Sequence, residues 1–287
     1  MPKKSTKKIF GVLGYPVKHS LSPAMHNAAF RHLKIKASYR KFEVSPEDLG
    51  RFLRTLAHNN IRGLNVTIPH KEKILSYLTS YKTSAADEIG AVNTVVVDKN
   101  GRLKGYNTDY LGFSRHLSEL SLRPKRIAII GAGGAAKAVC FSLAKKGAQE
   151  IAIFDIDNYK SISLMQRLQE GFSTCRLLAV NRIEGLKLKD KDLLVNASPV
   201  GMQPQDPCLV TEDMLPTGIF VYDLIYNPAE TKLLSLARQK GLRYSNGLGM
   251  LLYQGAESFN LWMKPKKAPL SVMSAAFKQA LRKKFKA

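Results

Sequence analysis

The segment Arg126-Ile127-Ala128-Ile129-Ile130-Gly131-Ala132-Gly133-Gly134-Ala135-Ala136 decides the fold. An apolar run of strand length passes directly into a glycine turn, and the apolar residues after it have helical spacing. In this context a G-x-G-x-x-A turn lets backbone N–H groups approach a pyrophosphate at the positive end of a helix. We therefore expect a dinucleotide-binding turn at Gly131, Gly133, Gly134 and Ala135; the alternative is a glycine-rich turn without a ligand.

A second strand, predicted over 150–154, ends at Asp155, which lies 24 residues after Gly131. A carboxylate at this place can accept hydrogen bonds from both hydroxyls of an adenosine ribose. Asp155 and Asp157 would repel the 2′-phosphate of NADP, and no arginine follows at once to bind it. The pattern favours NAD. NADP remains open because Lys160 could pair with a phosphate, and the acids could instead form a polar turn with a helix cap.

Two later strands, predicted over 192–195 and 220–226, lead to Ser198 and Tyr226. Ligands of open parallel sheets bind outside the carboxyl ends of the strands. Both strand ends are therefore expected to face the nicotinamide half of the cofactor.

The rest of the chain alternates strand-like and helix-like segments, which predicts an α/β protein. Upstream, strands are expected at 9–13, 38–42, 63–67 and 91–97 with a hairpin return at 103–106, and helices at 24–33, 46–58, 71–78 and 110–121. The helical segments 250–263 and 274–284 have no strand to pair with, so we expect them to return to the first domain. The predicted architecture is an N-terminal α/β substrate domain (1–110 and 246–287) and a Rossmann-type doubly wound parallel-sheet domain (111–245).

The net charge of +23, from 45 Lys+Arg against 22 Asp+Glu, raises the possibility of nucleic-acid binding. The basic residues are dispersed, however, and the two terminal clusters lack a recognisable recognition helix and are expected to be solvated: Lys3, Lys4, Lys7, Lys8 and Arg282, Lys283, Lys284, Lys286. A positive potential also attracts anionic ligands. We expect a cytoplasmic protein, since no apolar run approaches the ~18 residues of a membrane span.

The three cysteines, Cys140, Cys175 and Cys208, have no CxxC spacing. The sequence thus predicts buried or inert thiols, no disulfide and no metal site.

Three motifs precede the glycine turn: Gly14–Asn27 (GYPVKHSLSPAMHN), Gly63–Lys71 (GLNVTIPHK), and Glu88–Thr94 (EIGAVNT) together with Gly105–Asp109 (GYNTD). In the first, Ser22-Pro23 is typical of a helix cap followed by proline in the first turn. With the glycine turn and Asn246–Ala256 (NGLGMLLYQGA), these motifs resemble the shikimate dehydrogenase family in order and spacing over nearly the whole chain.

The resemblance implies a substrate domain, a Rossmann domain and returning C-terminal helices, and it implies the following roles. Ser20 and Ser22 would bind the substrate carboxylate; Thr67, Asn93 and Gln254 would bind ring hydroxyls; Tyr226 would help close the pocket; Gly247 and Met250 would lie near the nicotinamide; Lys71 and Asp109 would be the catalytic pair. Many members carry Asn-Arg-Thr where Asp155-Ile156-Asp157 stands here. This departure places the chain closer to the NAD-using quinate/shikimate branch.

The expected activity is reversible hydride transfer between shikimate and 3-dehydroshikimate with NAD or NADP, in the pathway to chorismate. An ammonium such as Lys71 can stabilise the developing alkoxide and donate its proton. Quinate oxidation on the same scaffold and a basic nucleic-acid-binding or regulatory protein on a degenerate dehydrogenase fold are the alternatives. The expected partner is a small molecule, shikimate or quinate, with no nucleic acid and no membrane, and the chain is expected to be a monomer or a homodimer.

Overall fold

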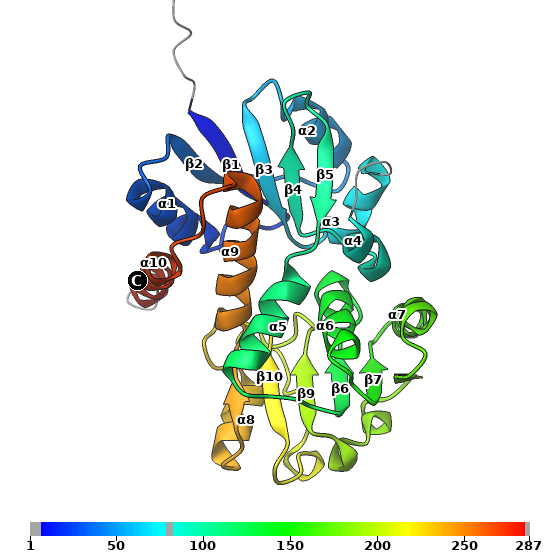
Figure 1. Ribbon diagram of the computed structural model, residues 1–287. Coiled ribbons are helices and arrows are strands. Elements are labelled where there is room, and N and C mark those ends of the chain that lie inside the picture. The colour runs from blue at the N-terminus through cyan, green and yellow to red at the C-terminus, as the bar shows by residue number, and fades with distance from the viewer. Residues whose placement is uncertain (1–6, 79–82, 285–287) are drawn as a thin grey trace, which may run out of the picture. The chain divides into compact units, whose positions relative to one another are not determined.

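A computed structural model describes residues 7–78 and 83–284 of the chain (Figure 1). The chain divides into two compact units: Met1–Thr108 with Leu252–Ala287 (unit 1), and Asp109–Leu251 (unit 2). None of the helices in the described ranges is long and apolar enough to cross a membrane.

Unit 1 is built on a mixed five-stranded sheet of order β2-β1-β3-β4-β5. The strands are β1 (Lys8–Gly14), β2 (Ala37–Glu43), β3 (Ile61–Val66), β4 (Thr94–Val97) and β5 (Leu103–Tyr106). β1 pairs in parallel with β2 and β3, whereas β3, β4 and β5 pair antiparallel, with Asn65 opposite Thr94. The predicted hairpin of β4 and β5 is confirmed. Because β1 and β3 run the same way, the loops that follow them lie at one edge of the sheet.

Helices cover both faces of this sheet. They are α1 (Ser22–His32), α2 (Leu49–Thr55), α3 (His70–Lys73) with a 3₁₀ turn (Ile74–Tyr77), α4 (Ser84–Ile89), α9 (Leu248–Met263) and α10 (Leu270–Lys284). Leu49 and Leu53 of α2 pack into a cluster with Leu64 and Val95. On the other face the ring of Phe10 lies 5.5 Å from Phe30 and 5.2 Å from Trp262. α10 packs against α1, so the expected return of the C-terminal helices to the first domain is confirmed.

Unit 2 contains a six-stranded, all-parallel sheet of order β11-β10-β9-β6-β7-β8. The strands are β6 (Arg126–Ile130), β7 (Glu150–Phe154), β8 (Arg176–Val180), β9 (Leu193–Asn196), β10 (Phe220–Asp223) and β11 (Tyr244–Ser245). Counted within the unit this is the order 3-2-1-4-5-6 of dinucleotide-binding folds. The chain reverses its direction of winding between β6 and β9, so a crevice is expected at their carboxyl ends.

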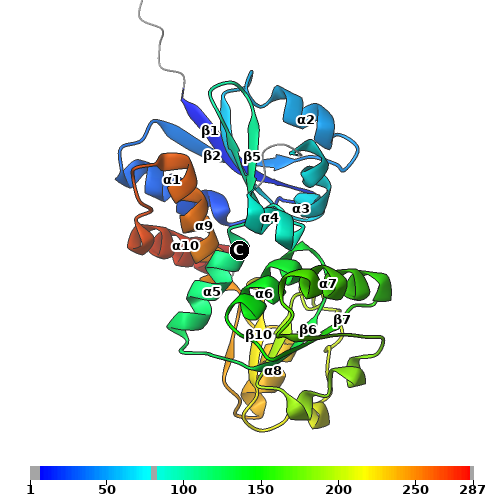
Figure 2. The ribbon, with the colours of Figure 1, turned by 45° about the vertical axis from the view of Figure 1, so that its right-hand side comes forward.

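The helices of unit 2 are α5 (Asp109–Glu119), α6 (Gly134–Lys145), α7 (Asn158–Gly171) and α8 (Lys232–Gln239), with 3₁₀ turns at Ile183–Leu186, Leu188–Asp190 and Glu212–Met214 (Figure 2). Most of α6 is buried. The remaining apolar core joins Ile130, Leu194 and Val221 of the sheet to Leu233 and Leu234 of α8. The α/β class and the Rossmann-type second sheet are confirmed.

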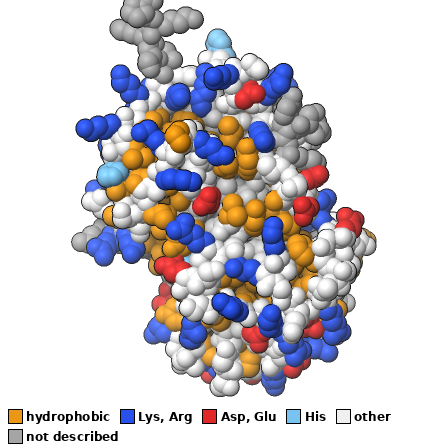
Figure 3. All heavy atoms as spheres, viewed as in Figure 1, with side chains coloured by type: hydrophobic (Ala, Val, Ile, Leu, Met, Phe, Trp, Pro, Cys, Tyr) orange, Lys and Arg blue, Asp and Glu red, His pale blue; other side chains and the backbone are white. Residues whose placement is uncertain are grey.

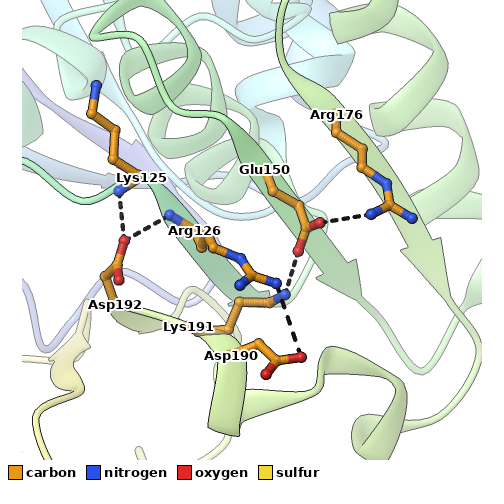
Figure 4. A network of polar contacts seen from close by, with 7 residues as sticks. All are labelled: Lys125, Arg126, Glu150, Arg176, Asp190, Lys191 and Asp192. Carbon is orange, nitrogen blue, oxygen red and sulfur yellow. Dashed lines mark hydrogen bonds and ion pairs between the residues drawn. The ribbon is translucent and has the colours of Figure 1, made fainter.

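An ion-pair network lies at the amino ends of the unit 2 strands (Figure 4). Glu150 pairs with the Nζ of Lys191 and, at 3.1 Å, with Arg176, while Asp192 accepts from the backbone N–H groups of Lys125 and Arg126 at 2.8 Å. Lys191 lowers the pKa of the Glu150 carboxyl, chiefly by donating a hydrogen bond. Ion pairs and hydrogen bonds from carboxylates to backbone N–H groups therefore connect the strands at this edge.

Lys and Arg side chains are scattered over the face shown in Figure 3 rather than gathered on one element. Of the expected basic clusters, Arg282 and Lys283 are exposed, whereas Lys3, Lys4 and Lys286 lie outside the described residues.

All three cysteines are free. Cys140 and Cys175 are buried, and burial raises the pKa of Cys175 to about 11. Cys208 is exposed; burial therefore keeps two of the thiols from reacting, but not the third.

Candidate functional site

The glycine turn of unit 2 combines a residue of positive φ with the start of a helix. Gly131 has φ of +105°, and a Cβ there would lie 2.9 Å from the backbone N of Ser198. A Cβ on Gly133, by contrast, would meet nothing within 4 Å. Gly133 is the N-cap of α6, and Gly134 is its first residue. Gly131 is thus required by the fold, while Gly133 leaves open space at the N-terminus of α6, the kind of position at which proteins bind anions.

The two acids after β7 bind the backbone around this turn. Asp155 accepts from the N–H of Ala132 at 2.7 Å and from the N–H of Asp157 at 2.9 Å. Asp157 is the N-cap of α7, where it accepts from Tyr159 N–H, and it pairs with Lys160 at 3.4 Å. Each carboxylate oxygen has two lone pairs, so Asp155 keeps acceptor capacity for a ribose hydroxyl. The cap considered from the sequence is formed by Asp157.

The next strand ends bring further polar groups to the same edge of unit 2. Asn196 Oδ1 accepts from the backbone N–H and the hydroxyl of Ser198, at 3.0 and 2.7 Å, while its Nδ2 donates to Asp223 at 3.0 Å. Burial raises the pKa of the Asp223 carboxyl. Tyr226 follows this strand and is half-buried. The loop carrying Ser198 is therefore fixed by hydrogen bonds within the unit.

The backbone just before α9 lies so close to Leu224 that only glycine can occupy position 247. A Cβ on Gly247 would lie 1.9 Å from the carbonyl oxygen of Leu224. Asn246 Oδ1 accepts from Leu248 N–H at 3.2 Å, and Met250 is buried. These contacts fix the backbone at the start of α9, and Met250 lies in its first turn.

In unit 1 the expected carboxylate-binding serines lie before and in the first turn of α1. The expected cap by Ser22 is wrong: α1 begins at Ser22 itself, and Leu21, in the N-cap position, has helical φ and ψ. The hydroxyl of Ser20 instead accepts from Ser22 N–H at 3.3 Å. Pro23 does lie in the first turn, as expected. Thr67 follows β3, and its N–H donates to Leu13 at 2.9 Å.

Asn93 and Gln254 come together although 161 residues separate them in sequence, with Asn93 Nδ2 donating to Gln254 Oε1 at 3.2 Å. Both side chains are buried. The two amides expected to bind ring hydroxyls therefore act as one hydrogen-bonded pair.

Lys71 and Asp109 belong to different units. Lys71 is half-buried in α3, where its carbonyl accepts from Val92 N–H at 2.8 Å. Asp109 is buried, with 5% of its surface exposed, and is the first residue of α5. Within the described part of the chain no group of three or more His, Cys, Asp or Glu could hold a metal ion.

Sequence reasoning assigned no role to four buried polar residues that surround the amide pair: Asn65, Thr94, Thr108 and Ser258. The one signal was the spacing of Gln254, Ser258 and Trp262, four residues apart, which places all three on one face of a helix.

The sheet order of unit 2 and its glycine turn are those of the dinucleotide-binding class of proteins. Comparisons with known proteins agree. A model described as the shikimate dehydrogenase substrate binding domain matches residues 12–95, and one described as the shikimate 5′-dehydrogenase C-terminal domain matches residues 247–276. The chain belongs to the shikimate dehydrogenase family.

The relatives cover both units. A shikimate dehydrogenase (NADP(+)) from Caldanaerobacter subterraneus subsp. tengcongensis is 44% identical over 262 residues, covering 90% of this chain and 92% of that protein. The shikimate 5-dehydrogenase of Thermus thermophilus, solved with NADP(H) and shikimate, is 36% identical with a TM-score of 0.84, covering 96% of this chain and 100% of that one. A quinate dehydrogenase from Corynebacterium glutamicum, solved with NAD, is 29% identical with a TM-score of 0.85, covering 95% and 99%.

Proposed function

We propose that this protein is a shikimate dehydrogenase that interconverts shikimate and 3-dehydroshikimate with a nicotinamide dinucleotide. The observation that carries the proposal is similarity to a shikimate dehydrogenase at 44% identity over 90% of the chain. Two structural observations support it: the glycine turn at Gly131 and the hydrogen bond between the amides of Asn93 and Gln254.

The residues of unit 1 would bind and orient the substrate. Ser20 and Ser22 would donate to its carboxylate, and Thr67, Asn93 and Gln254 would bind its ring hydroxyls. In the oxidation Lys71 would accept the hydroxyl proton, and a bound nicotinamide ring would supply the redox chemistry by accepting the hydride of the reacting C–H bond. Asp109 would stabilise the resulting ammonium. In the reduction Lys71 returns the proton to the developing alkoxide.

NAD is the cofactor that the ribose site favours. The two carboxylates after β7 disfavour a 2′-phosphate, and Lys160 already pairs with Asp157. At the intervening position, where the family pattern implies arginine, this chain has Ile156, whose side chain is 97% exposed and cannot bind phosphate. The nucleotide-binding residues would be Gly131, Gly133, Gly134, Ala135, Asp155, Asp157 and Ser198, with Gly247 and Met250 beside the nicotinamide and Tyr226 closing the substrate pocket.

Steady-state kinetics with shikimate and quinate, each with NAD and NADP, test the function and the cofactor together. We expect the highest kcat/KM with shikimate and NAD. Lys71→Met, which keeps the length of the side chain, should lower kcat by about a hundredfold or more because a general acid–base contributes 10²–10⁴-fold. Near-normal turnover in that variant would remove Lys71 from the chemistry. A wild-type preference for NADP would overturn the ribose argument.

Ile156→Arg tests the cofactor assignment in the opposite direction. The position is exposed, so the substitution should fold normally, and its guanidinium can pair with a 2′-phosphate. We expect the KM for NADP to fall about tenfold or more, with little change for NAD. Ile156→Gln, which is similar in length and uncharged, is the matched control. An equal effect of both substitutions would show that charge at this position does not select the cofactor.

A further inference from the structure

One face of α9 carries hydrogen-bonding side chains that contact strands of the unit 1 sheet. Trp262 Nε1 donates to Val95 O at 3.0 Å, and its ring lies over Gly63, where a Cβ would be 2.3 Å from Nε1. Ser258 and Gln254 follow on the same face at intervals of four residues. These contacts fix the position of α9 along the sheet, and with it the position of Gln254.

The middle of this face is a buried cluster of hydroxyls. The hydroxyl oxygens of Thr94, Thr108 and Ser258 lie 2.8 to 3.0 Å from one another. Asn65 Nδ2 donates to Ser258 at 2.7 Å and to Thr94 at 3.2 Å, while Asn65 Oδ1 accepts from the hydroxyl of Tyr39 at 2.7 Å. Thr94, Thr108 and Ser258 have no exposed surface. A buried amide is costly to leave unpaired, so each lost hydroxyl should disturb the whole cluster.

The cluster sets the orientation of the Asn93 amide. Asn93 Oδ1 accepts from the backbone N–H of Thr108 at 2.6 Å and from the hydroxyl of Thr94 at 3.1 Å. A reversed amide would place its Nδ2 against the Thr108 N–H, donor against donor. With this orientation Nδ2 faces Gln254, and Gln254 Oε1 accepts from it. The orientation of Asn93 therefore depends on the Thr108 N–H together with the Thr94 hydroxyl, and the orientation of Gln254 depends on the Asn93 amide.

We propose that Asn65, Thr94 and Ser258 are positioning residues for substrate specificity: they hold Asn93 and Gln254 in the one orientation that matches the hydroxyls of a polyhydroxylated cyclic carboxylate. This inference rests on the proposed function, which places Asn93 and Gln254 at the substrate. A site built to hydrogen-bond a hydroxyl discriminates strongly against an analogue that lacks it. That discrimination should fall when the amides are free to turn.

Thr94→Val is the most direct test because it replaces the hydroxyl with a methyl of similar size. We expect the KM for shikimate to rise about tenfold, with the KM for the dinucleotide unchanged. The ratio of kcat/KM for shikimate to that for a deoxy analogue lacking one non-reacting ring hydroxyl should fall by a similar factor. Ser258→Ala, which suits a helix interior, should have the same effect. Thr94→Ser keeps the hydroxyl and should restore the wild-type ratio.

Thr55→Val is the matched control, since it also removes one hydroxyl from unit 1, where Thr55 donates to Phe52 O at 2.8 Å in α2. If Thr94→Val lowers kcat/KM equally for shikimate and the analogue, or only lowers the melting temperature as Thr55→Val does, the positioning role is refuted. If the wild-type protein does not oxidise shikimate with either NAD or NADP, the proposed function is overturned, and this inference with it. An active wild type with an unchanged ratio in Thr94→Val overturns the inference alone.

Discussion

His26 should make the stability of unit 1 depend on pH between neutral and mildly acidic conditions. Its side chain is fully buried in α1, its ring stacks on Tyr39 at 4.3 Å, and neither ring nitrogen has a hydrogen-bond partner among the described residues. Burial lowers the pKa of His26 from 6.5 to about 3. The folded protein thus holds this side chain neutral over a range in which the unfolded chain protonates it.

The direction and size of the effect follow from the shifted pKa. A histidine whose pKa is lower in the folded state contributes fully above pH 6.5, and the contribution is lost as the pH falls toward 3. Between pH 7 and pH 5 only the unfolded chain takes up the proton. His26 should therefore lower the free energy of unfolding by about 2 kcal/mol over this interval, since each pH unit below the unfolded pKa is worth about 1.4 kcal/mol. His70 and His116, whose pKa values are also lowered by burial, add to this change in wild type and in the variants alike.

Urea unfolding followed by tryptophan fluorescence can measure this change. Trp262 is the single tryptophan, and its ring lies 5.4 Å from that of His26. His26→Phe keeps an aromatic ring on Tyr39 and cannot be protonated. Between pH 7 and pH 5 its free energy of unfolding should therefore decrease by about 2 kcal/mol less than that of wild type. The exposed His58 gives a control, His58→Gln, which should behave as wild type. Equal losses in wild type and His26→Phe would refute the burial argument.

Two further predictions concern unit 2. Gly247→Ala should unfold or fail to accumulate because its Cβ would lie 1.9 Å from the carbonyl oxygen of Leu224. Gly133→Ala has no neighbour within 4 Å, so it should melt like wild type but bind dinucleotide at least about tenfold more weakly. Melting curves and titration with NADH measure the two effects, and normal dinucleotide binding by Gly133→Ala would contradict the assigned turn. Lys191→Met should lower the free energy of unfolding by about 3 kcal/mol, because it leaves Glu150 buried with only the exposed Arg176 as a partner. Chemical denaturation at pH 7 measures this change. A decrease below about 1 kcal/mol would show that Glu150 and Lys191 contribute no more than a surface salt bridge.

The sequence predicted the strand, glycine turn and helix that begin at Arg126. Gly131 has the positive φ expected of a dinucleotide-binding turn, and Asp155 contacts that turn through the N–H of Ala132. Both were visible because glycine and aspartate at this spacing have few other uses. The cap at Ser22 was mispredicted because the pattern does not show the backbone angles of Leu21, which are already helical.

Long-range hydrogen bonds between neutral side chains could not be predicted. Asn65 and Ser258 are 193 residues apart, and each alone is an ordinary polar residue in a strand or a helix. Their partnership depends on the packing of α9 on the sheet, which in turn depends on Gly63 leaving room for Trp262. The four-residue spacing of Gln254, Ser258 and Trp262 places them on one face of a helix, but it does not identify their partners on the sheet, which became visible only in the folded chain.

The amino and carboxyl ends of the unit 2 strands carry different kinds of polar groups. At the amino edge, Glu150 and Lys191 are buried opposite charges that satisfy each other. At the carboxyl edge the groups are glycines, amides and acids whose hydrogen bonds to the backbone, such as that of Asp155, leave lone pairs unused. Because a paired charge has little capacity left for a ligand, substitutions at the amino edge should change the free energy of unfolding, and those at the carboxyl edge should change the affinity for dinucleotide.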